Sequence, residues 1–435
     1  MAQRKASWNK SLTASVSALL GSGGREDEGP APVYSKPKFT SLSMYKSIRR
    51  YETIGGVMGL KTPFFQTIEG CQGNYVLIDG RPRLNFAWCD YLGLNQHPSL
   101  REAAKIADDR FGTCVSGSRM AAGQTPLHLE LEREIADFLG VDDALLFVSG
   151  HAANVSTIAA IMTPADLIVH DEFVHNSAVM GTRLSGATAR PFKHNDLEAL
   201  EKVLKEERGK HANCLVVIEG LYSAEGDLPD LAKVIELKER YGAWLMVDDA
   251  HGLGVLGKGG RGIAEHSGID ARKVDIWMGT LSKTLASCGG YIAGDKVLIE
   301  VLKHSAGGFV YSVGLPPAMT AAALAALKVI KAEPERVARL HAHGRLFLKI
   351  AGKKKFNTAG SAGFGMLPIL PGATTKVVRL WHKLLERDIN TSLIIYPGVP
   401  MKTGRLRFFL TSEHTDEEIA STLDAVDEEM RKIII

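Results

Sequence analysis

Between about residues 99 and 325, short apolar runs alternate with longer amphipathic segments. The amphipathic segments predict helices near Ala152–Met162, Leu197–Glu207 and Leu231–Tyr241. Such alternation indicates an α/β domain whose mostly parallel sheet is covered by helices on both faces. The apolar runs have the length and composition of buried strands, and they are Ala144–Val148, Leu167–Val169, Cys214–Ile218, Trp244–Val247, Asp275–Met278 and Tyr291–Ala293.

The pattern changes on either side of this stretch. Asn74–Leu84 is a candidate hairpin with Asp79-Gly80 at its turn, and after Ala318 two long helices precede strands near Met366–Leu370 and Arg405–Leu410. A last helix is expected from Asp416. We therefore predict four parts: a flexible basic tail (1–40), an arm with a hairpin (41–98), a large α/β domain (99–325) and a smaller α+β domain (326–435).

Composition is that of an ordinary globular protein, with 435 residues, 45% of them hydrophobic, and a formal net charge of +3. The small positive excess gives no argument for nucleic acid, and no apolar run approaches the roughly 20 residues of a membrane span. The apolar patch Val16–Leu20 is too short for a signal peptide. Five scattered cysteines without a CxxC pair make a reducing cytoplasm the expected location, and His170 and His175 lack the spacing of a metal site.

One lysine stands out in the stretch Asp275–Gly294. Lys283 follows a buried strand and is surrounded by Ser, Thr, Ala and Gly, so it cannot be solvated like a surface lysine. Burial disfavours its ammonium form and lowers its pKa, which is what an amine needs in order to form a Schiff base.

Other polar groups also follow strands, where ligands of open α/β sheets bind. Asp248 ends a buried strand and needs a cation, and a protonated pyridinium nitrogen would supply one. A lysine that forms an imine and an aspartate that holds such a nitrogen are the two groups that pyridoxal phosphate chemistry requires. The remaining candidates around such a cofactor are His251 for its phenolic oxygen, His175 against its ring, and Gly150, His151, Thr280 and Ser282 for its phosphate.

Two literal motif matches point elsewhere. Gly252–Gly257 fits GxGxxG after a strand, but it runs on into a loop and not into a helix, so a nicotinamide-dependent oxidoreductase is a weak alternative. The segment 279–284 (GTLSKT) has Ser282 where a P-loop needs glycine before its lysine.

The chain resembles the pyridoxal-phosphate-dependent α-oxoamine synthases, a family that includes serine palmitoyltransferase and amino-oxononanoate synthase. The GTLSKT loop is more similar to serine palmitoyltransferases and to their relatives in polyketide pathways than to other branches. The matching stretches are DYLGL (90–94), PLHLELE (126–132), FVSGHAAN (147–154), IEGLYSAEGDLPDL (218–231), VDDAHGLGVLGKGGRG (247–262), GTLSKTLASCGGYIAG (279–294), FVYSVGLPP (309–317) and RLRFFLTSEHT (405–415).

The resemblance implies a fold type I transferase, similar to aspartate aminotransferase, and a homodimer with a shared site. Lys283 would hold the cofactor and Asp248 its ring nitrogen, while His251, His175, Gly150, His151, Thr280 and Ser282 would take the places named above. Further residues match family positions: Ser223 near the ring, Ser312 reaching the phosphate of the other subunit, and Arg405 or Arg407 binding the amino-acid carboxylate, with Arg407 favoured.

The implied reaction is a decarboxylative condensation of serine, alanine or glycine with an acyl thioester. Coenzyme A and an acyl carrier protein stay open as donors, and the basic tail mildly favours the carrier protein. An aminotransferase or an aldolase would share the fold. One departure concerns Cys89-Asp90, which stand where the family usually has asparagine at the substrate, so altered amino-acid recognition is one interpretation and a neutral exchange is the other.

Overall fold

The computed structural model describes residues 35–57, 59–396, 398–400 and 402–433. Its contacts divide the chain into two units, residues 1–62 and 63–435. In the first unit, the short helix η1 (Phe39–Ser41) precedes α2 (Ser43–Val57). Most of the predicted basic tail, residues 1–34, lies outside the described residues. No helix in the described ranges is long and apolar enough to cross a bilayer.

The second unit contains two sheets, and the larger has seven strands in the order β4-β10-β9-β8-β7-β5-β6. Neighbours from β9 to β6 run parallel, and β10 is antiparallel to both β4 and β9. The mostly parallel sheet predicted from the sequence is therefore confirmed. Its strands are β4 (Asp143–Phe147), β5 (Leu167–Asp171), β6 (Thr188–Phe192), β7 (Cys214–Glu219), β8 (Trp244–Asp248), β9 (Ile276–Thr280) and β10 (Gly290–Gly294).

Both faces of this sheet are buried, because successive strand residues enter different clusters. In β8, Met246 belongs to a cluster that includes residues of α5, α6, α10 and α11, whereas Leu245 and Val247 belong to a cluster that includes residues of α4, α7, α8 and α9. The helices are α4 (Pro126–Leu139), α5 (Gly150–Ile161), α6 (Asn176–Ser185), α7 (Leu197–Glu207), α8 (Leu231–Arg240), α9 (Ile263–Ser267), α10 (Lys296–Ser305) and α11 (Gly307–Val310), and a second helical layer consists of α3 (Pro98–Phe111) and α12 (Pro317–Ala332).

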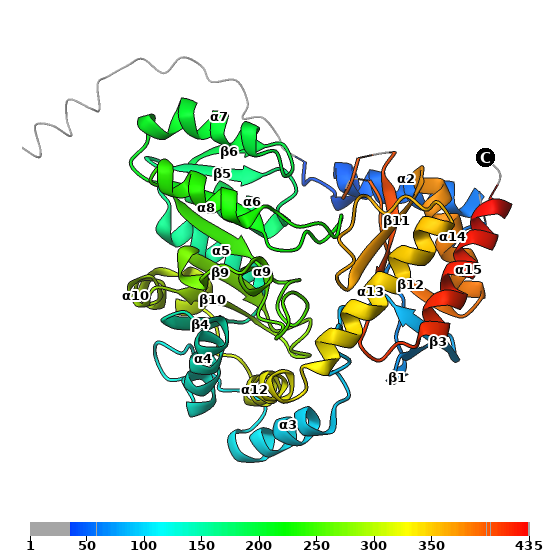
Figure 1. Ribbon diagram of the computed structural model, residues 1–435, viewed down its shortest axis with the longest axis horizontal. Helices are drawn as coiled ribbons and strands as arrows, with labels where there is room; N and C mark the ends of the chain where they lie inside the picture. The colour runs from blue at the N-terminus through cyan, green and yellow to red at the C-terminus, as the bar shows by residue number, and fades with distance from the viewer. Residues whose placement is uncertain (1–34, 58, 397, 401, 434–435) are drawn as a thin grey trace, which may run out of the picture. The chain divides into compact units, whose positions relative to one another are not determined.

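The smaller sheet has six strands in the order β1-β2-β3-β12-β13-β11. The predicted hairpin is present as β2 and β3, but it joins the carboxy-terminal strands through a parallel pairing of β3 with β12. Helices α13, α14 and α15 pack around this sheet (Figure 1). The bounds are β1 (Gly70–Gln72), β2 (Tyr75–Ile78), β3 (Arg81–Phe86), β11 (Met366–Gly372), β12 (Ile389–Ile394), β13 (Gly404–Phe409), α13 (Glu335–Lys353), α14 (Thr374–Glu386) and α15 (Asp416–Lys432).

Candidate active site

Lys283 lies in the tight loop that joins β9 to β10. The loop closes on itself, because Leu281 N donates to Gly289 O at 3.0 Å and Ala286 N donates to Lys283 O at 2.9 Å. Thr284, the next residue, donates from Oγ1 to Leu253 O at 2.7 Å. Burial is the main cause of the lowered pKa of Lys283, as the sequence predicted, and Arg407 adds to it, whereas Cys89, Asp248 and Glu219 oppose the shift.

Asp248 ends β8 at the centre of the sheet and is buried. Its Oδ2 accepts from Asn154 Nδ2 at 2.8 Å, and its Oδ1 accepts from Ala250 N at 3.1 Å. No cation of the described residues forms an ion pair with it. A buried carboxylate without a paired positive charge is costly, so the arrangement suits a positively charged ring nitrogen.

A hydrogen-bonded chain connects Asp248 to His175. Asn154 Nδ2 also donates to Ser177 Oγ at 2.9 Å, and Ser177 Oγ is 2.6 Å from His175 Nδ1. Because Ser177 N also donates to His175 Nδ1, at 3.3 Å, that nitrogen is the acceptor and the proton of the neutral ring is on Nε2. Burial lowers the pKa of His175, although Asp248 opposes this, so the imidazole is the stable form.

His251 is fixed by a tyrosine from the other side of the site. Tyr91 Oη lies 2.6 Å from His251 Nδ1, and both side chains are buried. Burial lowers the pKa of His251 and raises the pKa of Tyr91, so the phenol donates and the imidazole accepts. The remaining ring proton of His251 is therefore on Nε2.

Two further groups share the electrostatic environment of Lys283. Glu219, at the end of β7, is fully buried, and its Oε2 accepts from Ser223 N at 3.0 Å. Burial and the charge of Asp248 raise the pKa of Glu219 well above its usual range. Burial also raises the pKa of the Cys89 thiol, which Lys283 and Arg407 partly offset.

The amino end of α5 meets the hydroxyl groups that flank Lys283. A Cβ on Gly150 would lie 2.9 Å from Met278 Cε and 3.3 Å from Thr280 Oγ1, so glycine allows α5 to begin close to these side chains. Thr280 Oγ1 lies 2.8 Å from Ser282 Oγ and is also bonded to Gly289 O. His151 is exposed on the first turn of α5. Backbone N–H groups at a helix start, with two hydroxyl groups beside them, form a suitable phosphate cradle.

The two arginines of β13 have different environments. Arg405 is buried against the carboxylate of Glu225 and also donates to Ala224 O at 3.1 Å. Arg407 donates to Ser223 O at 3.0 Å and to Ser392 Oγ at 3.2 Å, but it has no carboxylate partner among the described residues, and its buried Nε has no hydrogen bond. Burial lowers the pKa of Arg407. An unpaired, half-buried guanidinium is suited to bind an anion.

Two predicted residues do not fit as expected. Both carboxylate oxygens of Asp90 accept backbone N–H groups, from Leu94 at 2.8 Å and from Asn95 at 3.1 Å, so Asp90 stabilises a turn. Ser312 is half-buried after α11, where no bond connects it to the lysine loop. Its expected role needs a second copy of the chain.

Buried Asp248 and half-buried Arg407 are thus an anion and a cation without ionic partners among the described residues, and Lys283 lies in the same electrostatic environment. These residues fit pyridoxal phosphate with a bound amino acid, which carries a ring cation, a phosphate and a carboxylate. Sequence reasoning missed Asn154, Ser177, Tyr91 and Glu219. Asn154, Tyr91 and Glu219 lie in the stretches that carry the family resemblance.

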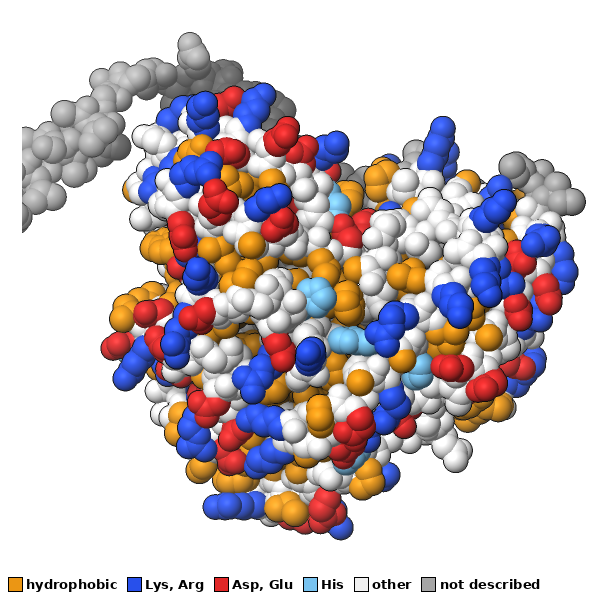
Figure 2. Space-filling view, viewed as in Figure 1, with side chains coloured by type: hydrophobic (Ala, Val, Ile, Leu, Met, Phe, Trp, Pro, Cys, Tyr) orange, Lys and Arg blue, Asp and Glu red, His pale blue; other side chains and the backbone are white. Residues whose placement is uncertain are grey.

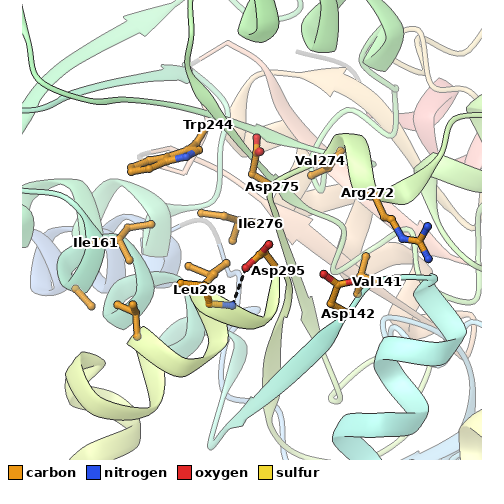
Figure 3. Close-up of a pocket in the computed structure, with 14 residues that line it drawn as sticks. Val141, Asp142, Ile161, Trp244, Arg272, Val274, Asp275, Ile276, Asp295 and Leu298 are labelled. Carbon is orange, nitrogen blue, oxygen red and sulfur yellow. Dashed lines mark hydrogen bonds between the residues drawn. The ribbon is translucent and has the colours of Figure 1, made fainter.

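A cavity of about 650 Å³ lies elsewhere. Figure 3 shows Trp244, Ile276, Leu298 and Ile161 around it, with Asp142, Asp275, Asp295 and Arg272 among its charged groups. Trp244 and Ile276 are the first residues of β8 and β9, so this cavity is at the amino ends of the parallel strands, away from the site.

The glycine-rich run after β8 serves packing. Gly252 and Gly262 leave no room for a Cβ beside the carboxylate of Asp249, and Gly254 (φ +73°) packs against Thr284. The helix that follows, α9, begins only at Ile263. A dinucleotide-binding motif needs its glycines to open a helix, and these do not, so the oxidoreductase alternative based on them is not supported.

Comparison with known proteins agrees with this geometry. The family model described as aminotransferase class I and II matches residues 81–426. An 8-amino-7-oxononanoate synthase of Methylococcus capsulatus is 40% identical over 366 residues, which are 82% of this chain and 92% of that protein. A serine palmitoyltransferase structure with pyridoxal phosphate has a TM-score of 0.87 at 25% identity and covers 91% of this chain and 99% of its own. The serine palmitoyltransferase of Sphingomonas wittichii has a TM-score of 0.87 at 28% identity, with the same coverage.

The chain belongs to the aminotransferase class I and II family, whose members have the fold type I architecture described above. Within it, the chain is a pyridoxal-phosphate-dependent α-oxoamine synthase, as the sequence predicted. It is an acyltransferase that condenses a small L-amino acid with an acyl thioester, and carbon dioxide, a thiol and an α-amino ketone are the products.

Proposed function

We propose that Lys283 is both the attachment point of the cofactor and the base of this reaction. Pyridoxal phosphate supplies an aldehyde that holds the amino acid's nitrogen and a ring that accepts the electron pair of its α-carbon. Burial lowers the pKa of Lys283, so its amine would be neutral and would take the α-proton of the bound amino acid. Asp248 keeps the ring nitrogen protonated, and Asn154 holds Asp248 in place.

The remaining side chains orient the reacting groups in this proposal. His251 directs its Nε2–H to the phenolic oxygen, because Tyr91 occupies its other nitrogen. His175 lies against the ring and directs its own Nε2–H to the substrate carboxylate or carbonyl, because Ser177 occupies Nδ1. Ser223 is the hydroxyl near the ring. The phosphate is held by the N–H groups of Gly150 and His151 and by the hydroxyl groups of Thr280 and Ser282.

Arg407 binds the amino-acid carboxylate, and Arg405 does not, because only Arg405 already has a carboxylate partner. The half-buried guanidinium of Arg407, which has no carboxylate partner among the described residues and a buried Nε without a hydrogen bond, is the observation that supports the assignment most directly. Cys89, whose pKa is influenced by Lys283 and Arg407, would take part in recognising the amino acid.

We favour L-alanine as the amino acid. An 8-amino-7-oxononanoate has a methyl group on the carbon that bears its amine, which alanine would supply, and sequence relatives with this product are 36% to 40% identical to the chain. L-Serine is the second candidate, because serine palmitoyltransferases share its fold at TM-scores of 0.87. The acyl group of the donor is carried on the thiol of either coenzyme A or a carrier protein.

The assembly we propose is a homodimer, with Ser312 reaching the phosphate bound by a second copy. The loop around it exposes Tyr311 and Val313, whose exposed fractions are 89% and 43%, so both side chains are accessible to a second copy. The five cysteines, all within described residues, are unpaired, which supports a cytoplasmic location.

The proposal is tested by measuring the rates with alanine, serine and glycine. Each amino acid is assayed with acyl-coenzyme A and with acyl carrier protein, and the release of thiol and of carbon dioxide is followed. We expect the highest kcat/KM with alanine. A higher kcat/KM with serine would identify serine, and not alanine, as the amino-acid substrate. In parallel, Lys283→Ala should lose nearly all activity, and its purified form should lack the visible absorbance of a lysine-bound cofactor. Retained borohydride-stable labelling elsewhere would refute the role of Lys283.

A further inference from the structure

His194 lies between two carboxylates at the edge of the proposed site. Its Nδ1 is 3.0 and 3.1 Å from the two oxygens of Asp171, and its Nε2 is 2.9 Å from Asp227 Oδ2. The exposed side-chain fraction is 14% for His194 and 0% for Asp171. Phe173 stacks on one face of the imidazole, with ring centroids 4.5 Å apart, and Tyr222 contacts it edge-on.

This geometry requires a proton on both ring nitrogens, because a carboxylate only accepts hydrogen bonds. Burial alone would favour the neutral ring, but Asp171 and Asp227 outweigh it and raise the pKa of His194 to about 10. Glu172 adds a third acidic group, since its Oε1 accepts the backbone N–H of His194 at 3.1 Å. Asn195 supports the bridge with bonds to Asp171 from its N–H and to Asp227 from its amide.

The bridge joins two separate parts of the large sheet's carboxyl edge. Asp171 is the last residue of β5, whereas Asp227 closes the loop 220–227 that follows β7. That loop is compact, because Tyr222 N donates to Asp227 O at 3.1 Å and Gly226 N donates to Tyr222 O at 2.9 Å. Any displacement of Asp227 therefore moves the whole loop.

The same loop contacts the arginine that we assign to the substrate. Ser223 O accepts from Arg407 Nη1 at 3.0 Å, which fixes the direction of the guanidinium, and Ser223 N is held by Glu219. Gly226 O accepts from Ala362 N at 2.8 Å, so the loop is also attached to the segment before β11. His194 thus lies one loop away from the carboxylate-binding group.

We propose that His194 is a positioning residue: as a charged bridge between Asp171 and Asp227 it fixes the loop 220–227, and through Ser223 it aims Arg407 at the amino-acid carboxylate. This inference rests on the proposed role of Arg407. His194 touches neither substrate nor cofactor. Its removal therefore weakens binding of the amino acid and leaves the acyl thioester and the lysine chemistry intact.

The test compares His194→Gln with wild type and with His304→Ala, a control on the exposed last turn of α10. Glutamine donates to one carboxylate only. We expect KM for the amino acid to rise about tenfold in His194→Gln, while KM for the acyl thioester, kcat and the cofactor absorbance at saturating amino acid change by less than about twofold. Adding Asp227→Asn, which removes the unpaired charge, should restore part of the lost affinity and covers the case in which the single variant does not fold.

A second measurement does not depend on activity. In protein labelled with ¹⁵N-histidine, both ring nitrogens of His194 should be protonated at pH 8, and His194→Gln identifies the signal. A neutral ring, or equal losses for both substrates, overturns the proposal. The variant Arg407→Ala separates the two hypotheses: if it leaves the amino-acid KM unchanged, the role of Arg407 fails, and if only His194→Gln has no effect, the positioning role alone fails.

Discussion

Asp249 gives a stability prediction that depends on pH. Its side chain is 4% exposed, its Oδ2 accepts one hydrogen bond, from Ile263 N at 2.9 Å, and its buried Oδ1 has no partner. Burial, reinforced by the neighbouring Asp248, raises the pKa of Asp249 from 3.8 to about 7. The folded protein therefore holds a proton on this carboxyl at pH values where the unfolded chain has lost it.

The sign follows from linkage. Because the folded pKa is raised, the stability that Asp249 contributes is fully present below about pH 4 and is lost as the pH rises through about 7. The shift from 3.8 to about 7 corresponds to roughly 4 kcal/mol in total, of which about 2.5 kcal/mol falls between pH 5 and pH 8. Asp249→Asn has no proton to lose, so this part of the pH dependence should disappear.

The assay is urea unfolding of the cofactor-free protein between pH 5 and pH 8, and the quantity is the difference between variant and wild type. Only the difference isolates Asp249, because other groups titrate as well. His128 and His414, with pKa values lowered by burial to about 4 and about 3, remove stability as the pH falls below about 6.5. His194, with a pKa of about 10, loses its stabilising effect as the pH rises toward that value.

Between pH 5 and pH 8, we expect the unfolding free energy of the variant to rise by about 2.5 kcal/mol relative to that of the wild type. A constant difference caused by the amide does not affect this change. The control Asp109→Asn, an exposed carboxylate on α3, should follow the wild-type curve. Parallel curves for Asp249→Asn and wild type would show that the buried carboxyl is ionised throughout. The argument from burial would then be wrong.

Two further substitutions test individual contacts. Tyr91→Phe leaves Nδ1 of His251 without a donor, so the unfolding free energy should fall by about 1–3 kcal/mol and the cofactor's absorbance should titrate at a different pH, and an unchanged titration would contradict the assigned tautomer. Arg405→Met should cost about 3–5 kcal/mol of stability by leaving Glu225 buried and unpaired, and adding Glu225→Met should recover most of it, as measured by urea unfolding. A double variant no more stable than the single one would show that the loss does not come from the unpaired carboxylate of Glu225.

Elements with a strong apolar period could be predicted from the sequence. Helix α7 has the predicted bounds Leu197–Glu207. Helix α6 was missed because its buried face consists of small residues such as Ala178, Gly181 and Ser185, which produce no apolar stripe. They allow close packing, since a Cβ on Gly181 would lie 3.0 Å from Ile158 Cβ. Strand β6 was missed because it is an edge strand with mostly exposed residues and a proline.

The net charge of the sequence does not indicate a binding partner, and the distribution of charged side chains on the surface does not indicate one either. Lys and Arg side chains are mixed with Asp and Glu over the face shown in Figure 2, without one dominant sign. The charges that matter are few and partly or fully buried. They could be found only from their places at strand ends, as with Asp248 and Lys283, or from the family resemblance, as with Arg407.

The expectation that ligand-binding groups follow the strands of an open α/β sheet covers only part of the proposed site. It applies to groups on one parallel sheet, and Asp248, His251 and the lysine loop do lie at or after the ends of strands β8 and β9 of that sheet. Arg407 comes from the second sheet and Tyr91 from the segment after β3, and their contacts with Ser223 and His251 span 184 and 160 residues of sequence. No local pattern encodes such pairings, because they depend on how the two sheets pack. The parts of the proposed site that come from different sheets are therefore those that a single sequence reveals least.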